Sequence, residues 1–285
     1  MQKNYDVLWA ATVRTKSFEE RLIAAVVGGF PAMTLFPIDV QRFTAGGLSI
    51  AEMRRISADY GIRLAVLDPL TQWLPDWQSP ASLSSEDLAF VNFEETAFLQ
   101  MAERLGVESI NVIETFGRVY PFDVFVENFA RICDRAREFG LKVHLEFMPF
   151  SSIPDLATAW EIVRQANRPN GGLLIDSWHY FRGTPNPSLL ASIPGELIFR
   201  VQLADALTEL HGSLFEDLMH HRLLPGDGEM DVLGLMQILK TIGGLSSVGL
   251  ELFSDAFDEL SPSEIGHRAQ ANFDQLVLAM ADRPD

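Results

Sequence analysis

The 285-residue sequence has little cysteine and few basic residues. Its single cysteine, Cys133, excludes an internal disulfide framework and a multi-cysteine metal site. Lysine and arginine together number 22 against 39 acidic residues, which gives a formal net charge of −17. A chain of this charge repels nucleic-acid phosphates and anionic lipid surfaces, so we expect neither nucleic acid nor membrane as a partner.

Long apolar segments are also missing from the sequence. No apolar run reaches the ~18 residues that suggest a membrane span. The first ten residues, MQKNYDVLWA, lack the apolar region of a secretory signal peptide. We therefore expect a cytoplasmic protein, and the hydrophobic content of 47% is ordinary for a folded globular chain.

The sequence does contain a regular alternation of short apolar runs with longer amphipathic stretches, which is typical of repeated βα units. The predicted strands are Val7–Val13, Ala32–Phe36, Ile62–Leu67, Ser109–Glu114, Lys142–Met148, Gly172–Asp176, Phe199–Leu203 and Val248–Phe253. The predicted helices are Phe18–Val27, Ile50–Tyr60, Ser85–Leu105, Phe122–Phe139, Pro154–Ala166, Val232–Ile242 and Ser263–Met280. This order predicts an α/β fold, a single (β/α)₈ TIM barrel with one domain over residues 1–285.

Polar residues interrupt four consecutive apolar strands late in the chain. They are Glu146 in VHLEFMP, Asp176 in LLIDSWH, Gln202 in FRVQLAD and Glu251 in VGLELFS. Parallel barrel strands are buried on both faces, so each residue is either hydrogen-bonded singly to a loop or part of a shared site. Because four such residues follow one another on adjacent strands, we expect them to converge at the barrel mouth.

Three buried carboxylates need a compensating charge, and one divalent cation is the simplest source of it. The oxygen donors of Glu146, Asp176, Gln202 and Glu251 favour Mg²⁺ or Mn²⁺, with Co²⁺ or Zn²⁺ as alternatives. These four residues are therefore the predicted metal ligands.

On these residues the chain resembles the xylose-isomerase-like TIM barrels, which include sugar epimerases and isomerases, inosose dehydratases and 3-dehydroshikimate dehydratases. Members of that family bind metal through Glu, Asp, His or Gln, and Glu on strands five to eight, in the order found here. A D-x-x-H stretch matches Asp176-Ser-Trp-His179, and an R-x-x-P-G-x-G loop matches Arg222-Leu-Leu-Pro225-Gly226-Asp-Gly228. The resemblance is strongest from Leu141 onward.

The resemblance implies a metal-dependent isomerase or epimerase that acts on a small polyhydroxylated keto compound through an enediolate or enolate. Glu146 and Glu251 would be its acid and base. His179 would contact the substrate or protonate a leaving hydroxyl, or would instead be a supporting or capping histidine. Arg222 would bind a carboxylate or hydroxyl-rich end of the substrate, or would bridge surface carboxylates.

Tryptophans lie near the expected mouth of the barrel and predict an aromatic substrate pocket, with Trp178 as a substrate contact. The alternative is that these side chains, Trp9, Trp73, Trp77 and Trp178, serve only to hold the loops together.

The sequence also fits activities other than isomerisation. The Gln at position 202 resembles the dehydratase branch and favours a lyase of the 3-dehydroshikimate or inosose type. Against it, Thr34-Leu-Phe-Pro37 and Leu67-Asp-Pro-Leu-Thr-Gln-Trp73 differ from the acidic and basic residues of that branch. An endonuclease IV-like phosphodiesterase would want more histidine ligands and a basic rim, and a noncatalytic barrel is a further alternative. The resemblance also allows a homo-oligomer.

Overall fold

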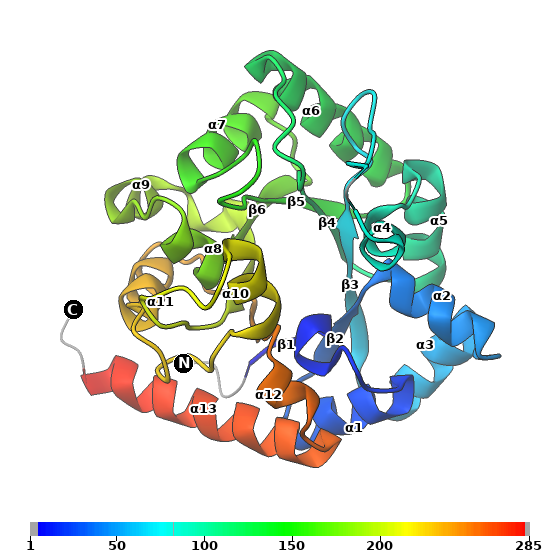
Figure 1. Ribbon diagram of the computed structural model, residues 1–285, viewed down its shortest axis with the longest axis vertical. Coiled ribbons are helices and arrows are strands. Elements are labelled where there is room, and N and C mark those ends of the chain that lie inside the picture. Colours follow the sequence, from blue (N-terminus) through cyan, green and yellow to red (C-terminus); the bar gives the residue numbers. More distant parts are fainter. Residues whose placement is uncertain (1–4, 82, 283–285) are drawn as a thin grey trace.

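The computed structural model describes residues 5–81 and 83–282, and its strands form a closed parallel barrel in sequence order (Figure 1). The strands are β1 (Val7–Leu8), β2 (Ala32–Leu35), β3 (Arg63–Leu70), β4 (Ser109–Val112), β5 (Lys142–Glu146), β6 (Gly171–Asp176), β7 (Ile198–Leu203) and β8 (Val248–Leu250). The barrel closes where β1 pairs with β8 in parallel register. The predicted (β/α)₈ fold is confirmed.

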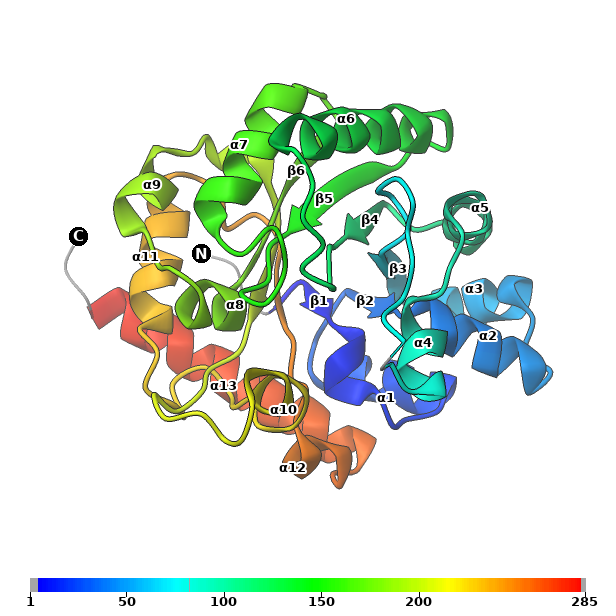
Figure 2. The same cartoon turned by 45° about the horizontal axis from the view of Figure 1, so that its top comes forward.

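Helices surround the barrel on its outside (Figure 2). They are α1 (Phe18–Val27), α2 (Pro37–Ala45), α3 (Ile50–Asp59), α4 (Ser85–Val91), α5 (Glu95–Leu105), α6 (Phe122–Glu138), α7 (Leu156–Ala166), α8 (Ser177–Arg182), α9 (Pro187–Ser192), α10 (Leu214–His220), α11 (Val232–Thr241), α12 (Asp255–Asp258) and α13 (Pro262–Asp282). The last described helix, α13, packs beside the first, α1.

Local sequence signals explain where several helices begin and end. Ser17 and Glu20 form a reciprocal capping box at the start of α1, and Ser49 and Glu52 form another at the start of α3. Helix α5 ends at Gly106, which adopts the left-handed conformation (φ 69°) that glycine tolerates best. The chain then enters β4 within a few residues, so the loops at this end of the barrel are short.

Tertiary contacts change some of the predicted elements. The predicted strand Val7–Val13 is a strand only at Val7–Leu8 and continues as a 3₁₀ helix, η1 (Ala10–Val13). The Thr12 hydroxyl donates to the Leu250 carbonyl (2.9 Å), which holds this turn against β8. The predicted helix Ser85–Leu105 is two helices, because the chain leaves helical geometry at Asn92 and Glu94 caps a new helix through its side chain.

Five short helices were not expected from the sequence: α2, α8, α9, α10 and α12. Helix α2 begins at Pro37, whose ring suits the first turn of a helix. Helix α8 begins directly after β6, with Asp176 as its N-cap. Among the described residues, no helix is both long and apolar enough to cross a bilayer.

Candidate metal and substrate site

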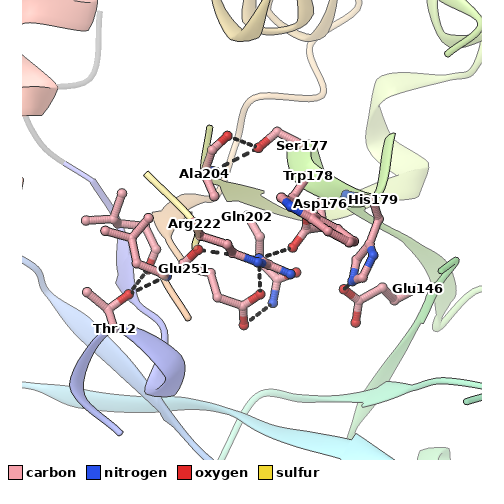
Figure 3. A network of polar contacts seen from close by, with 12 residues as sticks. Thr12, Glu146, Asp176, Ser177, Trp178, His179, Gln202, Ala204, Arg222 and Glu251 are labelled. Atoms are coloured by element: carbon pink, nitrogen blue, oxygen red, sulfur yellow. Dashed lines mark hydrogen bonds and ion pairs between the residues drawn. The ribbon is translucent and has the colours of Figure 1, made fainter. Parts of the chain in front are cut away.

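The four predicted ligands lie together at the carboxyl ends of β5 to β8 (Figure 3). Glu146 and Asp176 are the last residues of their strands, Gln202 is in β7, and Glu251 follows β8 directly. Their exposed fractions are 6%, 1%, 1% and 3% respectively. Parallel strands with neighbouring registers therefore deliver three carboxyl groups and one amide to the same buried place.

The tightest group in this site consists of Glu146, Asp176 and His179. Each offers one ligand atom, and these atoms lie within 4.8 Å of one another. The backbone amide of His179 donates to Asp176 Oδ1 (3.0 Å), because Asp176 caps the short helix α8. His179 Nε2 lies 3.4 Å from Glu146 Oε1, so the D-x-x-H spacing places the imidazole beside two carboxylates.

Gln202 and Glu251 form the other half of the site. Gln202 Nε2 donates to Glu251 Oε1 (2.8 Å), which turns the Gln202 carbonyl oxygen away from Glu251. That oxygen, Oε1, is buried without a hydrogen-bond partner in the described parts of the chain. An unsatisfied carbonyl oxygen beside carboxylates is the donor that a hard cation uses.

Arg222 reaches the site from the loop between β7 and β8. Its Nη1 atom donates to Asp176 Oδ2 (2.7 Å) and Glu251 Oε2 (3.1 Å), and the side chain is 1% exposed. The guanidinium lies between the rings of Trp178 and Phe253, 5.4 and 5.2 Å from their centroids. Arg222 is thus a buried partner of the site carboxylates, and the surface position considered for it is wrong.

Burial and mutual repulsion dominate the electrostatics of the site. Burial, reinforced by the neighbouring Asp68 and Asp176 carboxyls, raises the pKa of Glu146 well above its ordinary value. Burial also raises the pKa of Glu251 well above its ordinary value, although Arg222 opposes this. For Asp176, burial is outweighed by the charge of Arg222 and by the hydrogen bonds from Arg222 and the His179 backbone, so its pKa is lowered.

These pKa shifts bear on whether a divalent cation fits the residues that are present. One guanidinium faces four carboxyl groups, those of Asp68, Glu146, Asp176 and Glu251. Without further positive charge, the pKa values of both glutamates in this group lie well above their ordinary values. A divalent cation would remove this cost and would satisfy the free Gln202 oxygen, so the donor set fits such an ion.

Sequence reasoning missed a polar group on β3 and β4, the strands that precede β5 in the barrel. Asp68 on β3 and Asn111 on β4 are 4% and 0% exposed. Asn111 Nδ2 donates both to Asp68 Oδ1 (2.8 Å) and to Glu146 Oε2 (2.5 Å). Burial raises the pKa of Asp68 to about 7. The sequence does contain one signal for this group, because Asp68 interrupts an apolar strand. It lies in the Leu67-Asp-Pro segment, which differs from the corresponding segment expected in the dehydratases.

The structure holds the predicted tryptophans in different ways, and Trp77 is only partly buried. Trp73 Nε1 donates to the Ile113 carbonyl (2.9 Å) and Trp178 Nε1 to Asp217 Oδ2 (3.0 Å), so both are fixed in the interior. Trp9 is also buried, at 1% exposure. Beside Arg222 the aromatic surface comes from Trp178 and Phe253. Phe253 stacks on Phe36 (6.0 Å), which meets Phe90 edge to face (4.8 Å).

Comparison with known proteins identifies the family. The family model described as xylose isomerase-like TIM barrel matches residues 22–274. The chain belongs to this family. A crystal structure of the IolI protein with a bound zinc atom superposes on 97% of this chain and 99% of its own length, with a TM-score of 0.82 and 21% identity.

Two curated relatives indicate how far the sequence similarity reaches. A 3-dehydroshikimate dehydratase of Pseudomonas putida is 27% identical over 84% of this chain, and the match covers 36% of the dehydratase. An inosose isomerase of Bacillus subtilis is 31% identical over 49% of this chain and 50% of its own length. The chain therefore matches about a third to a half of the length of these relatives.

Proposed function

We propose that this chain binds one divalent metal ion through Glu146, Asp176, Gln202 and Glu251 and isomerises or epimerises a small polyhydroxylated keto compound. The observation that carries the proposal is that two of these ligands, Glu146 and Asp176, are buried with ligand atoms within 4.8 Å of each other, beside His179. The free oxygen of Gln202 supports a fourth ligand. Mg²⁺ or Mn²⁺ suits these oxygen donors, and the zinc atom in the IolI structure keeps Zn²⁺ as an alternative.

When bound, the ion would polarise the substrate carbonyl and stabilise the enediolate or enolate that forms on proton loss. Glu146 and Glu251 come from strands on different sides of Asp176 and Gln202, so they are the proposed acid and base. His179 Nδ1 and Arg222 Nε and Nη2 are buried without partners in the described chain. These atoms are the proposed contacts for the substrate oxygens.

Trp178 has a different proposed role from the direct contact expected from the sequence. Its ring lies 5.4 Å from the Arg222 guanidinium, and Asp217 fixes its indole nitrogen. Trp178 therefore holds Arg222 flat against one wall of the site. A rigid guanidinium presents its free nitrogens in one direction, which lowers the entropy lost when a substrate binds.

Dehydration of a keto compound is the second candidate. It is favoured by the amide at Gln202 and by the dehydratase similarity, which extends over 84% of the chain. Both reactions begin with removal of a proton beside a carbonyl, so the same residues would serve either one. Phosphodiester hydrolysis is disfavoured, because the described chain has one candidate metal cluster and it contains a single histidine.

The proposal is tested by incubating the metal-loaded protein in D₂O with keto sugars, inososes and 3-dehydroshikimate, followed by proton NMR. We expect exchange of the proton beside the carbonyl, with interconversion of isomers for an isomerase or loss of water for a dehydratase. Glu251→Gln should lose at least a hundredfold in rate, whereas Glu127→Gln, an exposed position on α6, should not change it. A metal-loaded protein that exchanges no proton in any of these compounds would contradict the proposal.

A further inference from the structure

A line of buried polar side chains runs through the barrel wall towards the candidate metal site. Ser109 and Asn111 lie on β4 and His144 lies on β5, and none is more than 1% exposed. Apolar residues normally fill a barrel interior, so each of these groups has a desolvation cost that its hydrogen bonds must offset. The line ends at Glu146 and Asp68.

The His144 ring lies between two polar side chains in this line. Arg200 Nη2 lies 3.5 Å from Ser109 Oγ, and a guanidinium can only donate, so Ser109 accepts from it. Ser109 Oγ lies 3.1 Å from His144 Nε2. The other ring nitrogen, Nδ1, faces the Asn111 amide.

The Asn111 amide has carboxyl groups on one side and the His144 ring on the other. Its nitrogen, Nδ2, donates to Asp68 Oδ1 (2.8 Å) and Glu146 Oε2 (2.5 Å). Its oxygen, Oδ1, therefore faces His144 Nδ1 (3.1 Å), and a ring nitrogen that meets an amide oxygen donates its proton to it. The reverse orientation would place an amide oxygen against Glu146 when that carboxylate is ionised as a metal ligand, which would be repulsive.

Glu146 consequently has its two oxygens in different environments. Oε2 is occupied by Asn111, and Oε1 lies 3.4 Å from His179 Nε2 in the cluster with Asp176. A carboxylate fixed through one oxygen cannot rotate freely to offer both oxygens to an ion. Its geometry as a ligand is set before the ion arrives.

We propose that Asn111 is the positioning residue of the metal site: it holds Glu146 so that one oxygen, Oε1, faces the ion, and His144 sets the orientation of the Asn111 amide. This inference rests on the proposed metal site at Glu146 and Asp176. Residues that orient metal ligands typically alter metal affinity by about 10- to 100-fold when they are removed.

The first test titrates the metal-free full-length chain with Mn²⁺ and measures free Mn²⁺ by electron paramagnetic resonance. Asn111→Ala should weaken Mn²⁺ binding by about 10- to 100-fold. The matched control is Asn272→Ala on α13, which removes a buried asparagine that bonds Tyr5 and the Pro225 carbonyl instead. This control should bind Mn²⁺ with wild-type affinity, and circular dichroism should show a folded barrel in both variants.

The second test separates orientation from simple packing. In His144→Asn the side-chain amide nitrogen can replace imidazole Nδ1 and still donate to Asn111, whereas His144→Leu removes the donor. We expect near-wild-type Mn²⁺ affinity in His144→Asn and a loss of about tenfold or more in His144→Leu. Equal losses in the two variants would overturn the role of His144, and this pair remains informative if Asn111→Ala does not fold.

The outcomes distinguish this inference from the proposed function. Wild-type Mn²⁺ affinity in folded Asn111→Ala would overturn the positioning role and leave the metal site in place. A wild-type protein that binds no divalent ion would overturn the metal site and the positioning role together.

Discussion

Asp68 differs from Asp176 and Glu251 in the partner that it has. Asp176 and Glu251 bond Arg222, whereas Asp68, like Glu146, is bonded by the neutral amide of Asn111. Burial is the largest influence on its ionisation and raises its pKa from the ordinary 3.8 to about 7. In the absence of a metal ion, this residue therefore retains a proton to near neutral pH.

This shift predicts how the stability of the metal-free protein depends on pH. The unfolded chain loses the Asp68 proton near pH 4, whereas the folded chain keeps it to about pH 7. The folded state binds more protons in this interval, so the free energy of unfolding contributed by Asp68 falls as the pH rises from about 4 to about 7.

Asp68→Asn should remove this contribution, because an amide does not ionise. With metal chelated, the variant should gain stability over wild type between pH 4 and 7, by a few kcal/mol at roughly 1.4 kcal/mol per pKa unit. Urea denaturation at pH 4.5 and pH 8 measures the difference. Parallel stability profiles for variant and wild type would show that Asp68 is already ionised in the fold.

Some residues of the site could be predicted from the sequence and others could not. Glu146, Asp176, Gln202 and Glu251 stand out because each interrupts an apolar strand near its end. The partnership of Asp68 with Asn111 depends on how β3 aligns with β4, and their register shifts between Leu67 and Leu70. No periodicity in the sequence indicates such a shift, so this part of the site required the structure.

At the scale of elements, the loop between β7 and β8 is organised by a buried carboxylate. Asp205 is 1% exposed and accepts hydrogen bonds from the backbone amides of Ala206, Gly226 and Met230, at 2.8, 2.8 and 3.0 Å. Its own backbone pairs with Leu223. Asp205 thereby shapes the loop that carries Arg222 into the site.

Position 228 requires glycine because two parts of the loop between β7 and β8 approach each other closely there. A Cβ atom at position 228 would collide with the Asp205 carboxylate and the Ala206 carbonyl. Gly228→Ala should therefore displace the loop and lower the free energy of unfolding by about 1–3 kcal/mol. Gly46→Ala is the matched control, because a Cβ there meets its neighbours no closer than 3.4 Å.

Urea denaturation of the two glycine variants makes the comparison. A Gly228→Ala midpoint equal to that of Gly46→Ala would mean that the loop absorbs the extra methyl group without strain. The expected result is a lower midpoint in Gly228→Ala alone.

The bounds of long helices such as α6 could be predicted from the sequence more accurately than those of short helices. Helix α6 was predicted within one residue, because its apolar face repeats over many turns and Gly140 follows it. Helix α8 has six residues, too few to show a period, and it depends on its cap at Asp176. Between Ala10 and Val13 the bond from Thr12 to Leu250 overrides a strand-like sequence.

At the scale of the whole molecule, the order of elements was sufficient to predict the barrel. Eight apolar runs separated by amphipathic stretches leave a parallel sheet with outer helices as the natural arrangement, and the structure closes that sheet between β1 and β8. The extent of the domain, residues 1–285, stays a prediction, and its ends lie outside the described residues. The homo-oligomer also stays a prediction.

The closed barrel brings together acidic groups that repel one another, and we propose that one divalent ion binds between them. Elemental analysis of the purified protein, after incubation with Mn²⁺, Mg²⁺ or Zn²⁺ and removal of free ion, tests this most directly. We predict about one ion per chain in the wild type and in the exposed control Glu127→Gln, and loss of the ion in Glu146→Gln and Asp176→Asn. A wild-type chain that retains none of these ions, or variants that retain as much as wild type, would contradict the account.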